Sequence, residues 1–146
     1  MSTQLLGLAI GGLLPALLFG IAGIFSKTSG DAGMPVGLHL VFIGLAVSTT
    51  GLLCNLLVPG RLPSAWAIAS SSMMGAFWAS GIGCLVFALI HYQTPLAKLV
   101  PLYNMNTLVT VGIALAVFAE WQGVNVGQLF LGAVLILVGG VLVSLA

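Results

Sequence analysis

Apolar residues dominate five long stretches of the chain, and none of them shows the alternation of apolar and polar positions that marks a membrane β-strand. The stretches cover residues 4–26, 35–57, 64–92, 95–120 and 124–146. A helix that crosses a hydrocarbon layer about 30 Å thick needs about 20 mostly apolar residues. Each stretch meets that length, so the pattern predicts five transmembrane helices.

The segments between these stretches are short and rich in polar residues, proline and glycine. They cover residues 26–33, 58–63, 91–95 and 120–125, of which the first is the longest. Connections this short make consecutive helices antiparallel neighbours. We therefore expect residues 1–146 to form one domain, an all-α bundle of five helices with little mass outside the membrane.

Charge is almost absent from the chain. It has 3 Lys+Arg and 2 Asp+Glu, so 3% of its residues are charged and 60% are hydrophobic, against about 25% charged in a typical soluble domain. Such a chain cannot stay dispersed in water, and three scattered basic residues cannot neutralise a nucleic-acid backbone. The composition predicts a multi-pass protein of the lipid bilayer, in the plasma (inner) membrane, with no nucleic-acid partner.

The few charges leave the orientation in the membrane nearly undetermined. We call side A the side that the chain reaches after its first helix, and side B the other. Lys27 and Lys98 lie towards side A, and Arg61 lies towards side B. Because basic residues favour the cytoplasmic side, a score of two to one favours a cytoplasmic side A only slightly. No charged residue falls at mid-depth, so the sequence indicates no buried proton relay.

Neutral polar residues gather on one face of the fourth stretch. At about 100° per residue, Tyr103, Asn106, Thr107 and Thr110 share roughly a third of a helix circumference. Amides and hydroxyls lack partners in lipid, so this face should turn inwards. It either bonds neighbouring helices together or forms one wall of a solute pathway.

Three further residues are candidates for the same pathway. Trp78 falls near the middle of the third stretch, where its indole N–H needs a partner, and Ser71 shares its face. The side chain of Trp78 either lines a cavity or packs against neighbouring helices. Pro15 predicts a distortion of the first helix.

Small residues spaced four apart form stripes that let helix backbones approach closely. We assign helix packing to these positions, together with two glycines that share a face of the fifth stretch. They are Gly7, Gly11, Gly75, Ala79, Gly83, Gly132 and Gly139.

The residues that most often carry chemistry form no recognisable set here. His39 and His91 lie near side A, without the Cys, Asp or Glu neighbours of a metal site. The two cysteines differ too much in predicted depth to form a disulfide within one chain. Common hydrolase and metalloprotease motifs are missing. We therefore expect no enzyme, no metal and no cofactor.

Several segments resemble the EamA-type domain of the drug/metabolite transporter superfamily. The resemblance lies in Leu99–Val111 (Leu-Val-Pro-Leu-Tyr-Asn-Met-Asn-Thr-Leu-Val-Thr-Val), Ala116–Trp121 with Glu120 closing the fourth helix, Gln128, Gly132, Leu135–Gly140, and Pro15–Gly20 followed by Lys27. Phe19 stands where the family usually has tryptophan. The first helix also lacks the glutamate of the four-helix multidrug members, which speaks against proton-driven drug export.

That resemblance implies one half of a ten-helix transporter with two inverted halves. Two copies inserted in opposite orientations, an antiparallel homodimer, would restore the inverted repeat around a site at the midplane. The expected function is transport of a small neutral or zwitterionic metabolite by alternating access. The alternative is a small membrane subunit that transports nothing and stabilises other membrane proteins.

Overall fold

The computed structural model describes residues 3–118 and 120–146, and within this part the chain is helical and has no strand. Its described residues include five helical segments that are long and apolar enough to cross a membrane. These spans are Leu5–Asp31, Val36–Leu57, Ala65–His91, Leu96–Val117 and Val126–Leu145. The all-α class is confirmed, and so is the presence of five helical segments long and apolar enough to cross a membrane, which fit a multi-pass membrane protein.

The first span continues beyond its predicted end. It consists of α1 (Thr3–Leu8), a π-helical turn (Ala9–Leu13) and α2 (Leu14–Asp31), so most of the polar segment 26–33 is helical. The sequence places the end of the helix where the polar residues begin, whereas the structure ends it where the backbone changes conformation.

That change occurs at Gly33, which has a φ of +84°. The amide of Gly33 donates to the carbonyl of Gly30 at 2.9 Å, and the amide of Met34 donates to the carbonyl of Ser29 at 3.1 Å. This pair of bonds is a Schellman closure, which uses a left-handed residue, usually glycine, just after the helix. The connection is therefore a tight turn at residues 32–35.

The π-helical turn lies directly before Pro15. A proline ring crowds the carbonyl four residues earlier and supplies no N–H to it. Here the helix widens, and the amide of Leu14 donates to the carbonyl of Ala9, five residues back. The distortion predicted at Pro15 is present as a single π turn, a form often found at functional sites.

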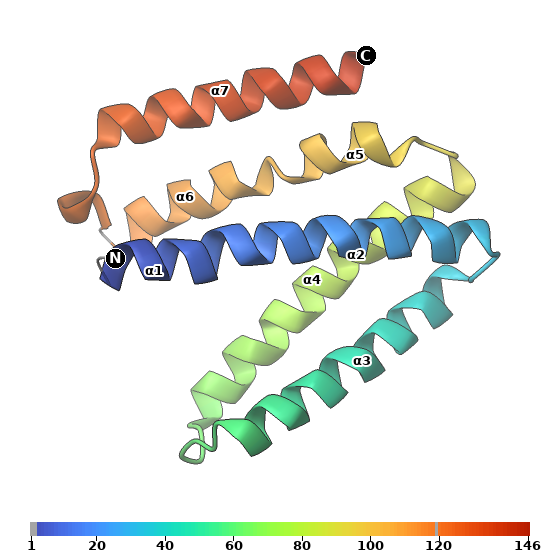
Figure 1. Ribbon diagram of the computed structural model, residues 1–146, viewed down its shortest axis with the longest axis horizontal. Helices are drawn as coiled ribbons and strands as arrows, with labels where there is room; N and C mark the ends of the chain where they lie inside the picture. Colours follow the sequence, from blue (N-terminus) through green and yellow to red (C-terminus); the bar gives the residue numbers. More distant parts are fainter. Residues whose placement is uncertain (1–2, 119) are drawn as a thin grey trace. The chain divides into compact units, whose positions relative to one another are not determined.

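Residues 1–93 form the first of two compact units. In it, α2 and α3 (Val36–Leu57) both pack against α4 (Ala65–His91). Figure 1 shows that α2 and α3 separate from each other with distance from the turn that joins them. Of the buried residues described in this unit, all but Gly23, which is in the middle of α2, lie towards the end of the helices where that turn is found. The buried residues are Gly23, His39, Val86 and Leu89.

Two glycines of this unit face a neighbouring helix at ordinary van der Waals distance. A Cβ atom at Gly30 would lie 3.5 Å from a side-chain carbon of Ile90, and one at Gly83 would lie 3.4 Å from a side-chain carbon of Leu40. Gly83 is one of the predicted packing positions. Gly30 was not predicted as a packing position, because it lies in the polar segment that the sequence indicates as a loop.

Residues 94–146 form the second unit. It contains α5 (Leu96–Tyr103), α6 (Asn106–Val117), a 3-10 turn (Glu120–Gly123) and α7 (Val126–Leu145). In this unit α5 packs against α7.

The contact between α5 and α7 centres on Gly140, which is buried. A Cβ atom there would lie 3.3 Å from both the sulfur of Met105 and the carbonyl oxygen of Pro101. At the predicted packing glycines Gly7, Gly11, Gly75, Gly132 and Gly139, an added Cβ would meet no described atom of another helix within 4 Å. Their packing role stays a prediction.

Candidate functional site

The fourth span is interrupted near its middle. Instead of the continuous helix predicted over 95–120, α5 ends at Tyr103 and α6 begins at Asn106. The amide of Met105 donates to the carbonyl of Leu102 at 3.1 Å, and the amide of Thr107 donates to the carbonyl of Asn104 at 3.2 Å. These bonds reach back three residues rather than four. A 3-10 turn inside a helix often marks a hinge.

Pro101 lies inside α5, shortly before the interruption. It has no N–H for the carbonyl of Ala97, four residues earlier, and its ring crowds that carbonyl. The helix continues for only two residues beyond Pro101 before the turn. The sequence carries a signal for this interruption, a proline followed closely by two asparagines. Asparagine favours turns over helix interiors.

Two threonines and two asparagines at the interruption differ in their hydrogen bonding. The hydroxyl of Thr107 donates to the carbonyl of Asn104 at 2.9 Å, and that of Thr110 donates to the carbonyl of Asn106 at 3.2 Å. Each threonine hydroxyl thereby donates its proton to a backbone carbonyl three or four residues earlier. The side-chain amides of Asn104 and Asn106 are exposed on this unit and bond to no described residue.

An interruption of this kind has a consequence in a membrane. Irregular backbone and unpartnered amides are tolerated at membrane depth only where protein covers them or where they line a water-filled cavity. Each amide without a partner in hydrocarbon costs a few kcal/mol. The segment 103–107 therefore needs polar surroundings.

The chemistry available at this segment is neutral hydrogen bonding. Each asparagine amide has two N–H donors and a carbonyl acceptor, and the phenol of Tyr103 is both donor and acceptor. Such groups match a solute with hydroxyl, amide or zwitterionic groups. The residues that the sequence predicts as one polar face lie within or beside the interruption. They are Tyr103, Asn106, Thr107 and Thr110.

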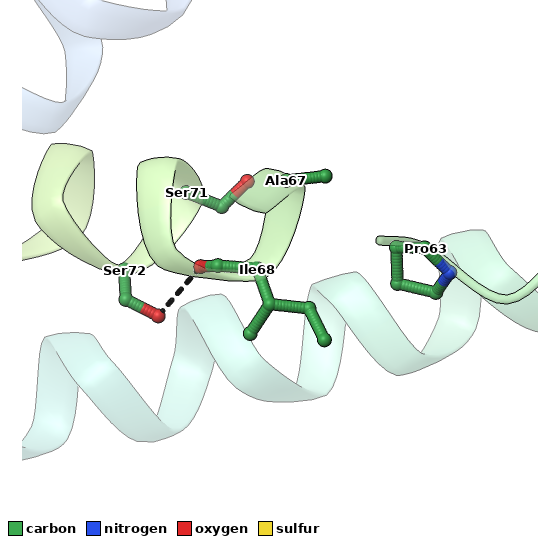
Figure 2. Close-up of a pocket in the computed structure, with 5 residues that line it drawn as sticks. All are labelled: Pro63, Ala67, Ile68, Ser71 and Ser72. Carbon is green, nitrogen blue, oxygen red and sulfur yellow. Dashed lines mark hydrogen bonds between the residues drawn. The ribbon is translucent and has the colours of Figure 1, made fainter. Parts of the chain in front are cut away.

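Ser71 lies in a shallow hollow of about 420 Å³ at the start of α4 (Figure 2). The residues that line it are Pro63, Ala67, Ile68, Ser71 and Ser72. The hydroxyl of Ser72 donates to the carbonyl of Ile68 at 2.9 Å, whereas that of Ser71 bonds to no described residue. The hollow is open, so by itself it encloses no ligand.

The other two pathway candidates are also in the first unit. Trp78 is seven residues beyond Ser71 on α4, hence on the same face, and its side chain is 45% exposed. Pro15 lies next to the π turn of the first span. A pathway that combines these residues with the fourth span joins positions from both units and stays a prediction.

A second polar cluster escaped the sequence analysis. His39, near the start of α3, is buried, with Ser29 Oγ 3.1 Å from its Nδ1 and Ser26 Oγ 3.5 Å from its Nε2. Both serines belong to the segment predicted as a loop. The two serines are three residues apart, which is the spacing of neighbours on one helix face. This spacing is the feature of the sequence that predicts the cluster.

An ion pair and a stacked ring pair also lie towards this end of the helices. Lys27 Nζ lies 2.6 Å from Asp31 Oδ1, one helical turn away, an arrangement that supports helix rather than loop. The ring of His91 stacks on Phe87 with centroids 4.0 Å apart. His91 was predicted to be interfacial, and it lies in the last turn of α4.

Comparison of the chain with protein-family models, with curated proteins and with solved structures found no match. The resemblance to EamA-type domains therefore rests on the segments quoted above, and it enters below as part of a proposal.

Proposed function

We propose that this protein is a half-size transporter of the plasma (inner) membrane that moves a small neutral or zwitterionic solute by alternating access. The observation that carries this proposal is the interrupted fourth span, with the unpartnered amides of Asn104 and Asn106. Transporters of the inverted-repeat class build their sites from discontinuous helices near the bilayer midplane.

The location of the interruption supports a solute site over simple packing. Packing polar groups usually bond to one another or to the adjacent backbone, as the hydroxyls of Thr107 and Thr110 do. The two asparagine amides make no such bond and flank a turn of the backbone. We assign Asn106 and Tyr103 to solute contact, and Asn104 and Met105 to the hinge.

The proposal includes an antiparallel homodimer. Five spans place the two termini on opposite sides of a membrane, and the basic residues favour neither orientation strongly. Two copies in opposite orientations would create the inverted pair that alternating access uses. The EamA resemblance suggests the same assembly, with Trp78, Ser71 and Pro15 on the pathway and the small-residue stripes as sliding contacts.

Solute flux into liposomes tests the site. We expect the wild-type protein to take up at least one member of a panel of radiolabelled neutral and zwitterionic metabolites. Asn106→Leu should reduce that uptake by about tenfold or more, because two hydrogen bonds to a neutral solute are worth about 1–3 kcal/mol. The variant should remain folded, because the Asn106 side chain makes no bond within the described chain.

Threonine provides a matched control. Thr110→Val removes a hydroxyl beside the interruption, and Thr49→Val removes one from α3 that bonds to the Leu45 carbonyl at 2.8 Å in the same way. Both variants should keep uptake close to the wild-type level, because each hydroxyl is satisfied by the backbone carbonyl one turn earlier. Equal uptake by wild type and Asn106→Leu would refute the site, and no uptake across the panel would refute transport.

A small non-transporting subunit is the second candidate. The observation that favours it is the set of glycines, including Gly75 and Gly132, that meet no neighbouring helix within the described chain. Such faces suit packing against a partner. Copurification of a second membrane protein, lost in Gly75→Leu, together with absent flux, would support this function instead.

A further inference from the structure

The second unit contains an apolar groove of about 300 Å³ between α6 and α7. Ten residues line it, and none of them has a polar or charged side chain. They include Leu108, Val111 and Leu115 on α6, and Leu129, Ala133 and Leu137 on α7. Water finds no hydrogen-bond partner in such a space, so an apolar cavity stays dry or takes up an apolar molecule.

The groove lies where the fourth span departs from α7. Before the interruption, α5 packs against α7, and the contact at Gly140 leaves no open space. After the interruption, the groove separates α6 from α7. Ala133 and Gly140 are seven residues apart and therefore share a face of α7. This one face of α7 is thus covered closely by α5 and left partly uncovered beside α6.

The groove extends through about one leaflet of a bilayer. Its α7 residues run from Val126 to Leu137, about 16 Å along the axis at about 1.5 Å per residue, and the hydrocarbon layer is about 30 Å thick. Because α7 begins at side B, the groove runs from the side-B surface to about mid-depth. Spread over that length, its volume admits one extended hydrocarbon chain but no helix, whose diameter is about 10–12 Å.

The groove is continuous with the outer apolar surface of α7. Two of its lining residues, Val126 and Phe130, are 51% and 71% exposed within the described chain, so the groove is open rather than enclosed. Leu131 and Leu135 continue the exposed apolar surface beside it. In a membrane, lipid hydrocarbon surrounds such a surface, and a lipid chain can enter the groove from there.

The groove is distinct from the polar segment of the fourth span. At about 100° per residue, Asn106 and Thr110 lie on the side of α6 that points away from Leu108 and Leu115. A molecule in the groove therefore meets the apolar side of α6 alone.

We propose that this groove is a binding site for one acyl chain of a phospholipid from the side-B leaflet. The headgroup lies at the side-B surface, where α7 begins, and the terminal methyl points towards the contact at Gly140. Because lipid tails are as apolar as the groove, the gain comes from van der Waals contacts with two helices and from filling an empty space. The proposal concerns the second unit alone and does not depend on transport.

Retention of lipid through detergent tests the site. The protein is reconstituted in vesicles of phosphatidylethanolamine and phosphatidylglycerol, extracted again in mild detergent, and examined by native mass spectrometry. We expect a single phospholipid to stay bound to each chain. Gly112→Leu places a side chain in the groove, where an added Cβ meets no other atom within 4 Å. It should reduce the retained lipid about tenfold or more, which corresponds to about 1.4 kcal/mol.

Gly139→Leu is the matched control. It makes the same substitution on α7 outside the groove, at a position where an added Cβ also meets nothing within 4 Å. This variant should retain as much lipid as the wild type.

A photoreactive lipid locates the chain in the unsubstituted protein. Phospholipids carrying a diazirine near the carbonyl end or near the methyl end of one chain are bound, washed with detergent and photolysed. The carbonyl-end probe should label residues near Val126, and the methyl-end probe should label residues near Leu137. The reverse order, or labelling confined to residues outside the groove, would contradict the proposal.

Ala133→Leu fills the groove from α7 and covers the case in which Gly112→Leu fails to fold. It should lose bound lipid to a similar extent. Equal retention in the wild type and in both filled variants would overturn the proposal, as would a wild type that retains no lipid. A wild-type dimer that both filled variants lose, with bound lipid unchanged, would show that a second copy occupies the groove instead.

Discussion

Individual polar residues in the spans differ in what they reveal about function. Serine and threonine hydroxyls in the helices mostly donate to the carbonyl one turn earlier, as those of Thr28, Thr50 and Ser80 do. This bond satisfies the hydroxyl with no external partner, so such residues fit a membrane helix without any functional role. An asparagine amide has too many donors and acceptors for that solution, which makes Asn104 and Asn106 the more informative residues.

Gly33 provides a prediction at the residue scale. Its φ of +84° is unfavourable for any residue with a Cβ atom. Gly33→Ala should destabilise the protein by about 1–2 kcal/mol, measured by thermal or denaturant unfolding in detergent. Gly37→Ala is the control, because Gly37 has open space around it and sits in helix α3. Equal loss of stability in both variants would argue against a Schellman turn at residues 29–34.

At the scale of elements, the chain distorts two of its five spans. The first has a π turn before Pro15, and the fourth has a 3-10 turn after Pro101. In both, proline removes a backbone donor and crowds a carbonyl. The second, third and fifth spans are continuous. Proline also stands at the N-cap of α3, Pro35, and at that of α5, Pro95, so its effect depends on its position in the helix.

Gly140 provides a prediction at the element scale. A Cβ atom at this position would lie only 3.3 Å from the carbonyl oxygen of Pro101 and from the sulfur of Met105. Gly140→Val should force α7 away from α5 and cost about 1–3 kcal/mol of stability, the usual penalty for overpacking. Thermal unfolding in detergent measures it. Gly139→Val, at the adjacent position with nothing within 4 Å, should cost much less, and the reverse order would contradict the observed contact.

At the scale of the whole molecule, the central question is orientation. A basic residue added to one side should bias insertion, because basic loops stay in the cytoplasm. Ala32→Arg adds a charge at the side-A turn, and Leu62→Arg adds one at side B beside Arg61. If the antiparallel dimer is the working form, each variant alone should lose solute uptake, and co-expression of the two should restore it.

The location of a C-terminal tag is the readout for orientation. If the antiparallel dimer forms, the tag in the wild type should be accessible from both sides of the membrane. Ala32→Arg and Leu62→Arg should each shift it towards one side, in opposite directions. A tag found on one side only in the wild type would contradict the antiparallel dimer.

Much of the architecture followed from the sequence alone. Membrane location, the all-α class and the five spans are consequences of apolar length, because a hydrocarbon layer sets a minimum length for any helix that crosses it. Helical periodicity also predicts one polar face on the fourth span, formed by Tyr103, Asn106, Thr107 and Thr110, and this face stays a prediction because the helix is interrupted between Tyr103 and Asn106.

Tertiary structure decided the features that depend on backbone conformation and on partners distant in the sequence. Polarity suggested a loop at 26–33, but the left-handed Gly33 ends the helix later, and only a helical Ser26 and Ser29 can reach His39. Periodicity treats each helix as regular, so it could not show that Pro101 and the asparagines divide the fourth span. Composition establishes that this chain lies in a membrane, whereas the bends of its helices and the pairing of its few polar groups arise from contacts that only the fold creates.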